Sequence, residues 1–333
     1  MKIGVFAVLL LLGGLPLTTL GGHSPGRLPR TYFYGSEYVR IDEWARSHGF
    51  QTSWRTPKDE LRVTSPYTSL TFNVDSRRAT INGVAVWLST PVAYRNGAAY
   101  IAPTDLATAI NPVLFPQKNP PRERVVTICL DPGHGGRDPG NREGKFQEKR
   151  YTLLLAQEVK SALSKAGFKV VLTRTGDSYP ELSARPDFAR RHKADLFVSL
   201  HFNSADSAGA RTVQGVEVYC LTPARARSTN ARGHSGGAGS AVGNRNDSQN
   251  MLLAYQLQRA LVQRLGAEDR GVRRARFEVL RVAEMPAVLI EAGFMTHPVE
   301  SKKIYNASHR QQMAQAIAAG ILAYKRAVEP TAK

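Results

Sequence analysis

Hydrophobic and polar positions follow different patterns in the two parts of the chain. After residue 124, short apolar runs alternate with longer segments in which apolar side chains recur every three or four positions. The short runs predict strands, and they occupy residues 125–130, 168–172, 196–200, 216–221 and 287–290. The longer segments predict amphipathic helices at residues 151–165, 251–265 and 311–328. This alternation is typical of an α/β fold in which helices cover a central sheet.

Residues 31–115 instead hold short β-like runs separated by turn residues, with two helical patches. Asn-Gly pairs between the runs suit tight hairpins, so we expect a small α+β N-terminal domain here. Its strand pattern resembles that of the copper amine oxidase N-terminal-like domain. We expect the tryptophans of this domain to form a buried aromatic core, with a sugar-stacking face as the alternative: Trp44, Trp54 and Trp87. Residues 116–123 are rich in proline and predict a linker.

The first 22 residues have the pattern of a signal peptide. Lys2 gives a positive start, residues 3–12 form an apolar run, and glycines and a proline then interrupt it. This run is too short to span a membrane. We therefore expect export to the periplasm or cell envelope, with no stable membrane span after processing; a retained N-terminal anchor is the alternative. Cys129 and Cys220 lie in apolar runs, so we expect buried free thiols, and a disulfide between them stays open.

The charge balance is strongly positive and predicts an anionic partner. The chain has 45 Lys and Arg residues against 27 Asp and Glu residues, a formal net charge of +18. Such a charge favours nucleic acid, lipid headgroups or an acidic wall polymer. The sequence has no nucleic-acid-binding signature, and an exported chain rarely meets DNA, so we expect no nucleic-acid partner. A hydrophobic content of 42% excludes wholesale disorder.

Three of the predicted strands run directly into a residue that can bind metal or transfer protons. These residues are His134, which follows Asp131-Pro132-Gly133, then His201 and Glu291. Because ligands bind at the carboxyl ends of strands in open α/β sheets, we expect the three side chains to share one cleft. The structural alternatives are that His134 is a turn histidine, that His201 is a core histidine and that Glu291 is the partner in a structural ion pair.

Glu148 stands just before the predicted helix at 151–165. A carboxylate there can simply complement the helix dipole. Two histidines and one carboxylate are, however, a standard ligand set for catalytic zinc. The spacing alone is weak support, because the sequence has no His-Glu-x-x-His helix.

Four sequence runs strongly resemble the zinc-dependent N-acetylmuramoyl-L-alanine amidases of the type 3 group: ICLDPGHGG, FQEKRYTLLLA, LFVSLHFNS and PAVLIEAGFMTH. They occur in the family's order, and the resemblance predicts a catalytic domain over residues 124–329. It implies a mixed central sheet flanked by helices. It also implies one zinc ion held by His134, Glu148 and His201, with Glu291 as the acid–base carboxylate. Asn203 either orients the substrate or stabilises its loop.

The resemblance also implies a reaction. The amide bond between N-acetylmuramic acid and L-alanine in peptidoglycan would be hydrolysed, with a protein activator as a further partner. Two alternatives stay open: a zinc peptidase that cuts the stem peptides, and a non-catalytic regulator that binds peptidoglycan on the same fold.

Residues 222–249 depart from the family pattern and read as a flexible insertion, rich in glycine and arginine. Some members of the family carry an inhibitory helix in the corresponding region. Glycine at this density disfavours a stable helix. We therefore interpret the insertion as a flexible basic flap that touches substrate carboxylates, with autoinhibition as the alternative.

Overall fold

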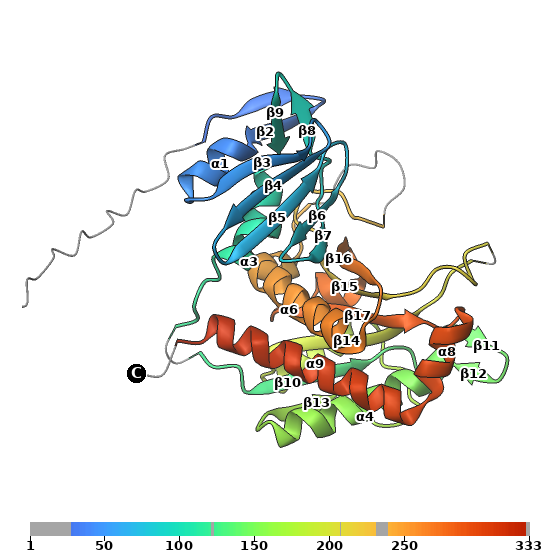
Figure 1. The fold of residues 1–333 in the computed structure, drawn as a ribbon. Coiled ribbons are helices and arrows are strands. Elements are labelled where there is room, and N and C mark those ends of the chain that lie inside the picture. Colours follow the sequence, from blue (N-terminus) through green and yellow to red (C-terminus); the bar gives the residue numbers. More distant parts are fainter. Residues whose placement is uncertain (1–27, 121–122, 207, 231–238, 331–333) are drawn as a thin grey trace, which may run out of the picture.

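The computed structural model describes residues 28–120, 123–206, 208–230 and 239–330 (Figure 1). The predicted signal peptide and the centre of the predicted insertion, residues 231–238, lie outside the described residues. Among the residues described, no helix is both long and apolar enough to cross a membrane. Both cysteines are free and buried, as expected from their apolar surroundings.

A mixed sheet of eleven strands forms the centre of the described structure. Its order is β13-β10-β14-β17-β15-β16-β7-β6-β5-β4-β3. The strands β13, β10, β14 and β17 are parallel, whereas β15 runs antiparallel to β17 and parallel to β16. This confirms the predicted fold class. The bounds are β10 (Thr127–Pro132), β13 (Lys169–Leu172), β14 (Leu196–Asn203), β15 (Val216–Leu221), β16 (Asp269–Ala275) and β17 (Ala287–Phe294).

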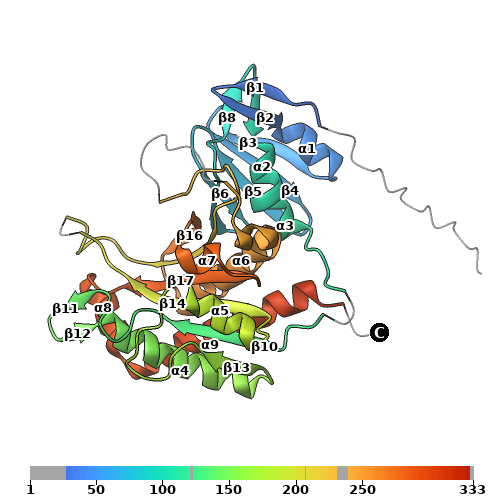
Figure 2. The same cartoon turned by 180° about the vertical axis from the view of Figure 1, so that it is seen from behind.

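Helices cover both faces of this part of the sheet. One face carries α4 (Glu148–Lys165), α6 (Asp247–Leu265) and α9 (Ala307–Val328), which lie in front in Figure 1. The other face carries α5 (Ala184–Arg191) and α7 (Glu278–Arg281), which lie in front in Figure 2. Side chains of β10 alternate between the two cores, since Ile128 and Leu130 pack in one cluster and Cys129 in the other. The short elements β11 (Arg142–Glu143), β12 (Phe146–Gln147) and α8 (Pro298–Tyr305) complete this region.

The strands of residues 31–115 extend the same sheet. A meander of β3 (Gln51–Thr56), β4 (Glu60–Ser65), β5 (Thr68–Asn73), β6 (Arg78–Ile81) and β7 (Val84–Trp87) joins it through the pairing of Val86 with Val272. A separate four-stranded sheet contains β1 (Thr31–Phe33), β2 (Ser36–Arg40), β8 (Ala93–Arg95) and β9 (Ala98–Ile101). The helical patches appear as α1 (Ile41–Ser47), and as α2 (Pro103–Asp105) continued by a π-helical turn and α3 (Asn111–Leu114).

Two of the three tryptophans of this segment belong to one hydrophobic core, and the third does not. Trp44 is buried, with 1% of its surface exposed, and so fits the expected aromatic core. Trp54 is half-buried but packs against the same hydrophobic cluster, whereas Trp87 is half-buried and lies outside that cluster, so the prediction is wrong for Trp87. The indole of Trp87 instead faces strand β16, where its N–H donates to the carbonyl of Arg270 (2.8 Å).

The described ends of the predicted insertion are anchored to the fold. The hydroxyl of Thr229 donates to the carbonyl of Arg274 and accepts from its N–H. Helix α6 begins at Asp247, inside the range predicted as insertion and four residues before the predicted start. Because residues 247–250 are polar, the apolar periodicity of the sequence did not reveal this first turn. The side chain of Asn250 is buried there because it binds the carbonyl of Gly243 and the N–H of Ala287.

Candidate functional site

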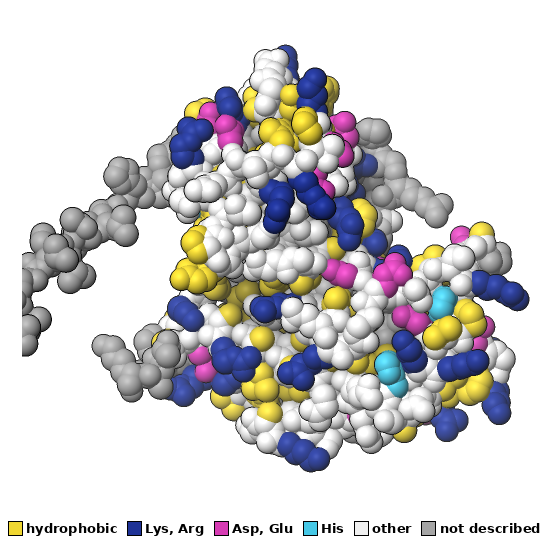
Figure 3. All heavy atoms as spheres, in the orientation of Figure 1, with side chains coloured by type: hydrophobic (Ala, Val, Ile, Leu, Met, Phe, Trp, Pro, Cys, Tyr) yellow, Lys and Arg dark blue, Asp and Glu magenta, His cyan; other side chains and the backbone are white. Residues whose placement is uncertain are grey.

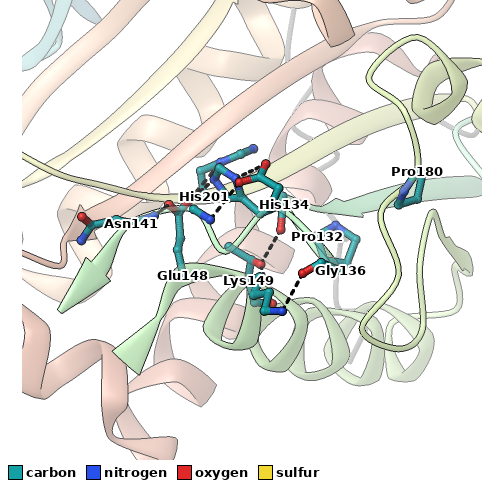
Figure 4. Close-up of polar contacts among 12 residues, drawn as sticks. Pro132, His134, Gly136, Asn141, Glu148, Lys149, Pro180 and His201 are labelled. Atoms are coloured by element: carbon teal, nitrogen blue, oxygen red, sulfur yellow. Dashed lines mark hydrogen bonds and ion pairs between the residues drawn. The ribbon is translucent and has the colours of Figure 1, made fainter. Parts of the chain in front are cut away.

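The four residues proposed for metal binding and acid–base chemistry line one pocket of about 300 Å³. The pocket lies at the carboxyl ends of β10, β14 and β17, where the parallel strands were expected to bring them together. His134 follows β10, His201 and Glu291 lie within β14 and β17, and Glu148 is the first residue of α4. Figure 4 shows His134, Glu148 and His201 pointing toward one another from three separate elements.

Glycines allow the three side chains to approach. A Cβ atom on Gly133 would collide with the ring of His201. A Cβ atom on Gly140 would lie 2.6 Å from both Oε2 of Glu148 and Cδ2 of His134. His134 itself has φ of +62°, a left-handed conformation that is unfavourable for a residue with a side chain. Such strain persists only where the surroundings fix it, and it is commonest at functional sites.

The three candidate ligand atoms form a nearly equilateral triangle. Nε2 of His134 lies 3.0 Å from Oε1 of Glu148, and Nδ1 of His201 lies 3.1 Å from that same oxygen. The two nitrogens are 3.1 Å apart. A tetrahedral ion with bonds of about 2.0–2.1 Å separates its ligands by roughly 3.3 Å. The donor set and its spacing therefore fit one zinc-like ion.

Hydrogen bonds orient each ligand. Nδ1 of His134 lies 2.8 Å from Oδ2 of Asp138, which leaves Nε2 with its lone pair toward the triangle when Nδ1 carries the proton. The carboxylate of Glu148 accepts from the backbone N–H groups of Asn141 (2.9 Å) and Phe202 (3.1 Å). Burial acts to raise the pKa of Glu148, but without a metal ion Nε2 of His134 and Nδ1 of His201 can donate to its carboxylate, and these hydrogen bonds outweigh burial and hold the pKa well below its ordinary value. Glu148 is therefore ionised, as a metal ligand must be.

Glu291 has a different environment. In the register of the sheet, Glu291 lies opposite His201 of β14 on one side and opposite Glu217 of β15 on the other. Its Oε2 atom is buried and has no hydrogen-bond partner among the described residues. Burial, followed by the nearby charges of Glu148 and Glu217, raises the pKa of Glu291 well above its ordinary value. A carboxyl with one buried, unpartnered oxygen and a raised pKa is suited to proton transfer.

Sequence reasoning missed several groups that support the site. Asp131 and Arg185 form an ion pair (3.0 Å) in which each side chain is 1% exposed. Arg185 also donates to the carbonyl of His134 (3.0 Å). The position of Asp138, four residues after His134, was an available signal, because a metal-binding histidine usually donates its other N–H to a carboxylate or carbonyl. Nothing in the local sequence indicates the pairing of Arg185.

Asn203 lines the pocket but is already engaged in hydrogen bonds. Its Nδ2 donates to Oε1 of Glu217 (2.8 Å), and its Oδ1 accepts from the N–H of Ser204. Its role toward the substrate stays a prediction. Four apolar side chains also line the pocket and form what we call its apolar wall: Leu182, Phe277, Val279 and Leu289.

Comparisons with known proteins concern the part of the chain that forms this site. Residues 128–323 match the family model described as N-acetylmuramoyl-L-alanine amidase. The amidase AmiC of Neisseria meningitidis serogroup B is 35% identical over 223 residues, which cover 60% of this chain and 53% of AmiC. The amidase LytC of Bacillus subtilis is 34% identical over 200 residues, which cover 60% of this chain and 36% of LytC. The chain thus spans about half or less of the length of these relatives.

Two solved structures agree with this match. The N-acetylmuramoyl-L-alanine amidase of Clostridium difficile 630 superposes with a TM-score of 0.51 at 33% identity, covering 61% of this chain and 97% of that one. AmiC2 of Nostoc punctiforme superposes with a TM-score of 0.50 at 33% identity, covering 60% and 97% of the two chains. The mixed sheet with its flanking helices is therefore the fold of known catalytic domains.

Proposed function

The chain belongs to the N-acetylmuramoyl-L-alanine amidase family, and on that premise we propose that it hydrolyses the amide bond between N-acetylmuramic acid and L-alanine in peptidoglycan. One observation carries the proposal: the ligand triangle and the unpartnered carboxyl of Glu291 face the same pocket. An amide is unreactive, so its hydrolysis needs both an activated water and a proton for the leaving amine.

The residues divide these tasks. His134, Glu148 and His201 would hold one Zn²⁺ ion, which when bound lowers the pKa of a coordinated water to about 7 and polarises a carbonyl. Asp138 fixes the ring orientation of His134 through Nδ1. Glu291, whose pKa is raised by burial, accepts a proton from the attacking water and returns it to the leaving nitrogen.

Two features of the surroundings support a peptidoglycan substrate. The apolar wall of Leu182, Phe277 and Val279 suits the methyl groups of the lactyl and alanyl units on either side of the scissile bond. The net charge of +18 suits a polymer that bears carboxylates. Figure 3 shows Lys and Arg side chains outnumbering acidic ones over α6 and α9. The signal-peptide pattern supports export of this activity to the periplasm or cell envelope, where a protein activator is a further candidate partner.

The test is digestion of purified sacculi by the whole protein, with and without a chelator, followed by mass analysis of the fragments. We expect intact stem peptides with free L-alanine amino termini beside intact muramic acid. New peptide ends within the stem would instead establish a peptidase. Activity that persists after removal of the metal would contradict the role of the ligand triangle.

The matched control is Glu291→Gln. This variant keeps all three metal ligands, so zinc should still bind with a stoichiometry of one, measured by elemental analysis. Turnover should fall by about 10²–10⁴-fold, because general acid–base catalysis is lost. Full activity of this variant would refute the assignment of Glu291.

A further inference from the structure

A row of side chains crosses five neighbouring strands and leads away from the pocket. Register pairs place His201 opposite Glu291 and Glu291 opposite Glu217, while Glu217 faces Gly271 on β16. Arg273, two residues after Gly271, lies on the same face of the sheet as Glu217. Trp87 follows Val86, the partner of Val272, so it lies on this face as well. Figure 1 shows the five strands β14, β17, β15, β16 and β7 side by side.

Glu217 is the centre of this row. It is 2% exposed, and its Oε2 atom lies 2.9 Å from Nε of Arg270 and 2.8 Å from Nε of Arg273. Its other oxygen accepts from Nδ2 of Asn203 and from the hydroxyl of Tyr219, each at 2.8 Å. Asn203 ends β14, two residues after His201, where the pairing with β17 is irregular. Glu217 thus fixes the end of the strand that carries a metal ligand, and it stands beside Glu291.

Trp87, in the N-terminal segment, contacts both arginines that bind Glu217. The guanidinium of Arg273 lies over the ring of Trp87, 4.8 Å from its centroid. The indole N–H of Trp87 donates to the carbonyl of Arg270 (2.8 Å). Trp87 therefore restrains the side chain of one arginine and the backbone of the other, and both arginines bind the same oxygen of Glu217. A cation stacked on an indole face is restrained both electrostatically and by packing.

We propose that Trp87 is a positioning residue for amide hydrolysis: through Arg270 and Arg273 it fixes Glu217, and through Glu217 it aligns Asn203 and the end of β14 beside Glu291. The segment 31–115 is then part of the catalytic unit, in addition to any binding role of its own. This inference rests on the proposed function. Small displacements of catalytic groups caused by distant changes can lower rates about 100-fold, so the chain of contacts has a measurable consequence.

The test compares variants of the whole protein on a soluble muramoyl-peptide. Trp87→Ala should lower kcat roughly tenfold while KM stays within about twofold, because alignment is lost and substrate contacts are kept. Trp87→Phe keeps a ring for Arg273 but loses the N–H donor, so its kcat should fall less. The control is Trp54→Ala, which changes the same residue type on the outer strand β3, where the ring contacts Tyr94. Its kcat should match the wild type.

A double variant separates positioning from general loss of structure. Glu217→Gln should lower kcat by itself, and Trp87→Ala should add little in that background if it acts through Glu217. Arg273→Lys, which keeps the charge but loses the planar stacking, should reproduce the loss of kcat. If Trp87→Ala does not fold, as judged by its melting transition, Trp87→Phe and Arg273→Lys carry the test.

Wild-type kcat in folded Trp87→Ala or Trp87→Phe would overturn the inference, as would an equal loss in Trp54→Ala. If the losses of kcat from Trp87→Ala and Glu217→Gln multiply fully in the double variant, the proposed route through Glu217 is overturned. Failure of the wild-type protein to release stem peptides would overturn the amidase proposal itself, and this inference with it. An active wild type with unaffected Trp87 variants would overturn the inference alone.

Discussion

The support beneath the candidate metal ligands can be tested by replacing Arg185 with methionine. The guanidinium of Arg185 donates to Oδ1 of Asp131 (3.0 Å) and to the carbonyls of Pro132 (3.2 Å), His134 (3.0 Å) and Pro180 (3.0 Å). Both members of the ion pair are 1% exposed, so water cannot replace these bonds. Methionine has a similar length and no charge, so Arg185→Met leaves the carboxylate of Asp131 buried without its cation.

The expected loss of stability is large. Removing one partner of a buried ion pair costs about 3–5 kcal/mol, because the remaining charge stays desolvated. The hydroxyls of Thr173 and Ser199 still donate to Asp131, which moderates but does not cancel this cost. For a domain of this size the change corresponds to a fall in Tm of roughly 6–20 °C. Zinc affinity should also fall by about 10–100-fold, because the carbonyl of the strained His134 loses its donor.

Denaturant unfolding of metal-free protein measures the first effect, and competition with a chromogenic chelator measures the second. Arg190→Met is the matched control, since Arg190 lies on the same helix but is exposed and pairs only with acidic residues at the surface; it should leave both quantities unchanged. The double variant D131N/R185M should recover part of the lost stability, because no charge is left buried. A loss below about 1 kcal/mol in Arg185→Met would refute the reasoning.

Two further predictions concern Glu291 and the insertion. Burial and two neighbouring carboxylates raise the pKa of Glu291 above its ordinary value of 4.5, so between these two pKa values the folded metal-free protein binds a proton that the unfolded chain has lost. The unfolding free energy of the wild type should therefore fall as pH rises through this window. The unfolding free energy of Glu291→Gln should exceed that of the wild type by a margin that grows above pH 4.5. A margin that does not change with pH would contradict this. Replacing Arg225, Arg232 and Arg245 with serine should weaken binding to sacculi several-fold and leave turnover of a soluble substrate unchanged. Faster turnover would indicate that the insertion is inhibitory. No effect on binding or turnover would exclude the basic flap.

Periodicity predicted most elements around the site but placed their ends too early. The apolar runs stop at Leu130, Leu200 and Ile290, whereas β10, β14 and β17 continue to Pro132, Asn203 and Phe294. The backbone ladder continues regardless of side-chain polarity, and the polar side chains at these ends bind one another. His201 and Glu291 therefore lie within strands, where they are held more rigidly than in loops.

Strand β16 has no apolar signature at all. Its sequence DRGVRRA holds three arginines and an aspartate. These side chains are accommodated by partners that are distant in sequence, since Arg270 and Arg273 bind Glu217 and Asp269 accepts from the N–H of Ala85. A local pattern cannot reveal such partners. For the same reason, the sequence could not predict that β7 joins the catalytic sheet.

The sequence could predict that His134, Glu148, His201 and Glu291 lie together, because each stands near a boundary that the sequence marks, either the end of an apolar run or a helix start. Their supports were not predictable, because a buried arginine such as Arg185 has the same appearance in sequence as an exposed one. The helix α5 that carries it is otherwise polar, with Arg190 and Arg191 at its surface. Only the packing of that helix distinguishes the three arginines.

The charges around the pocket explain why we assign the role of proton carrier to Glu291 and to none of the other acids. Among the described residues, every other carboxylate in or beside the pocket has a cationic or imidazole partner: Asp131 with Arg185, Asp138 with His134, Glu148 with His134 and His201, Glu217 with Arg270 and Arg273, and Glu278 with Arg281. Such partners favour the ionised form and keep a carboxylate from taking up a proton. Glu291 has no such partner and is flanked by two carboxylates that disfavour its charge. Giving Glu291 a nearby cation, for example by Leu289→Lys in the pocket wall, should therefore lower its pKa and its activity together, even though every proposed ligand is intact.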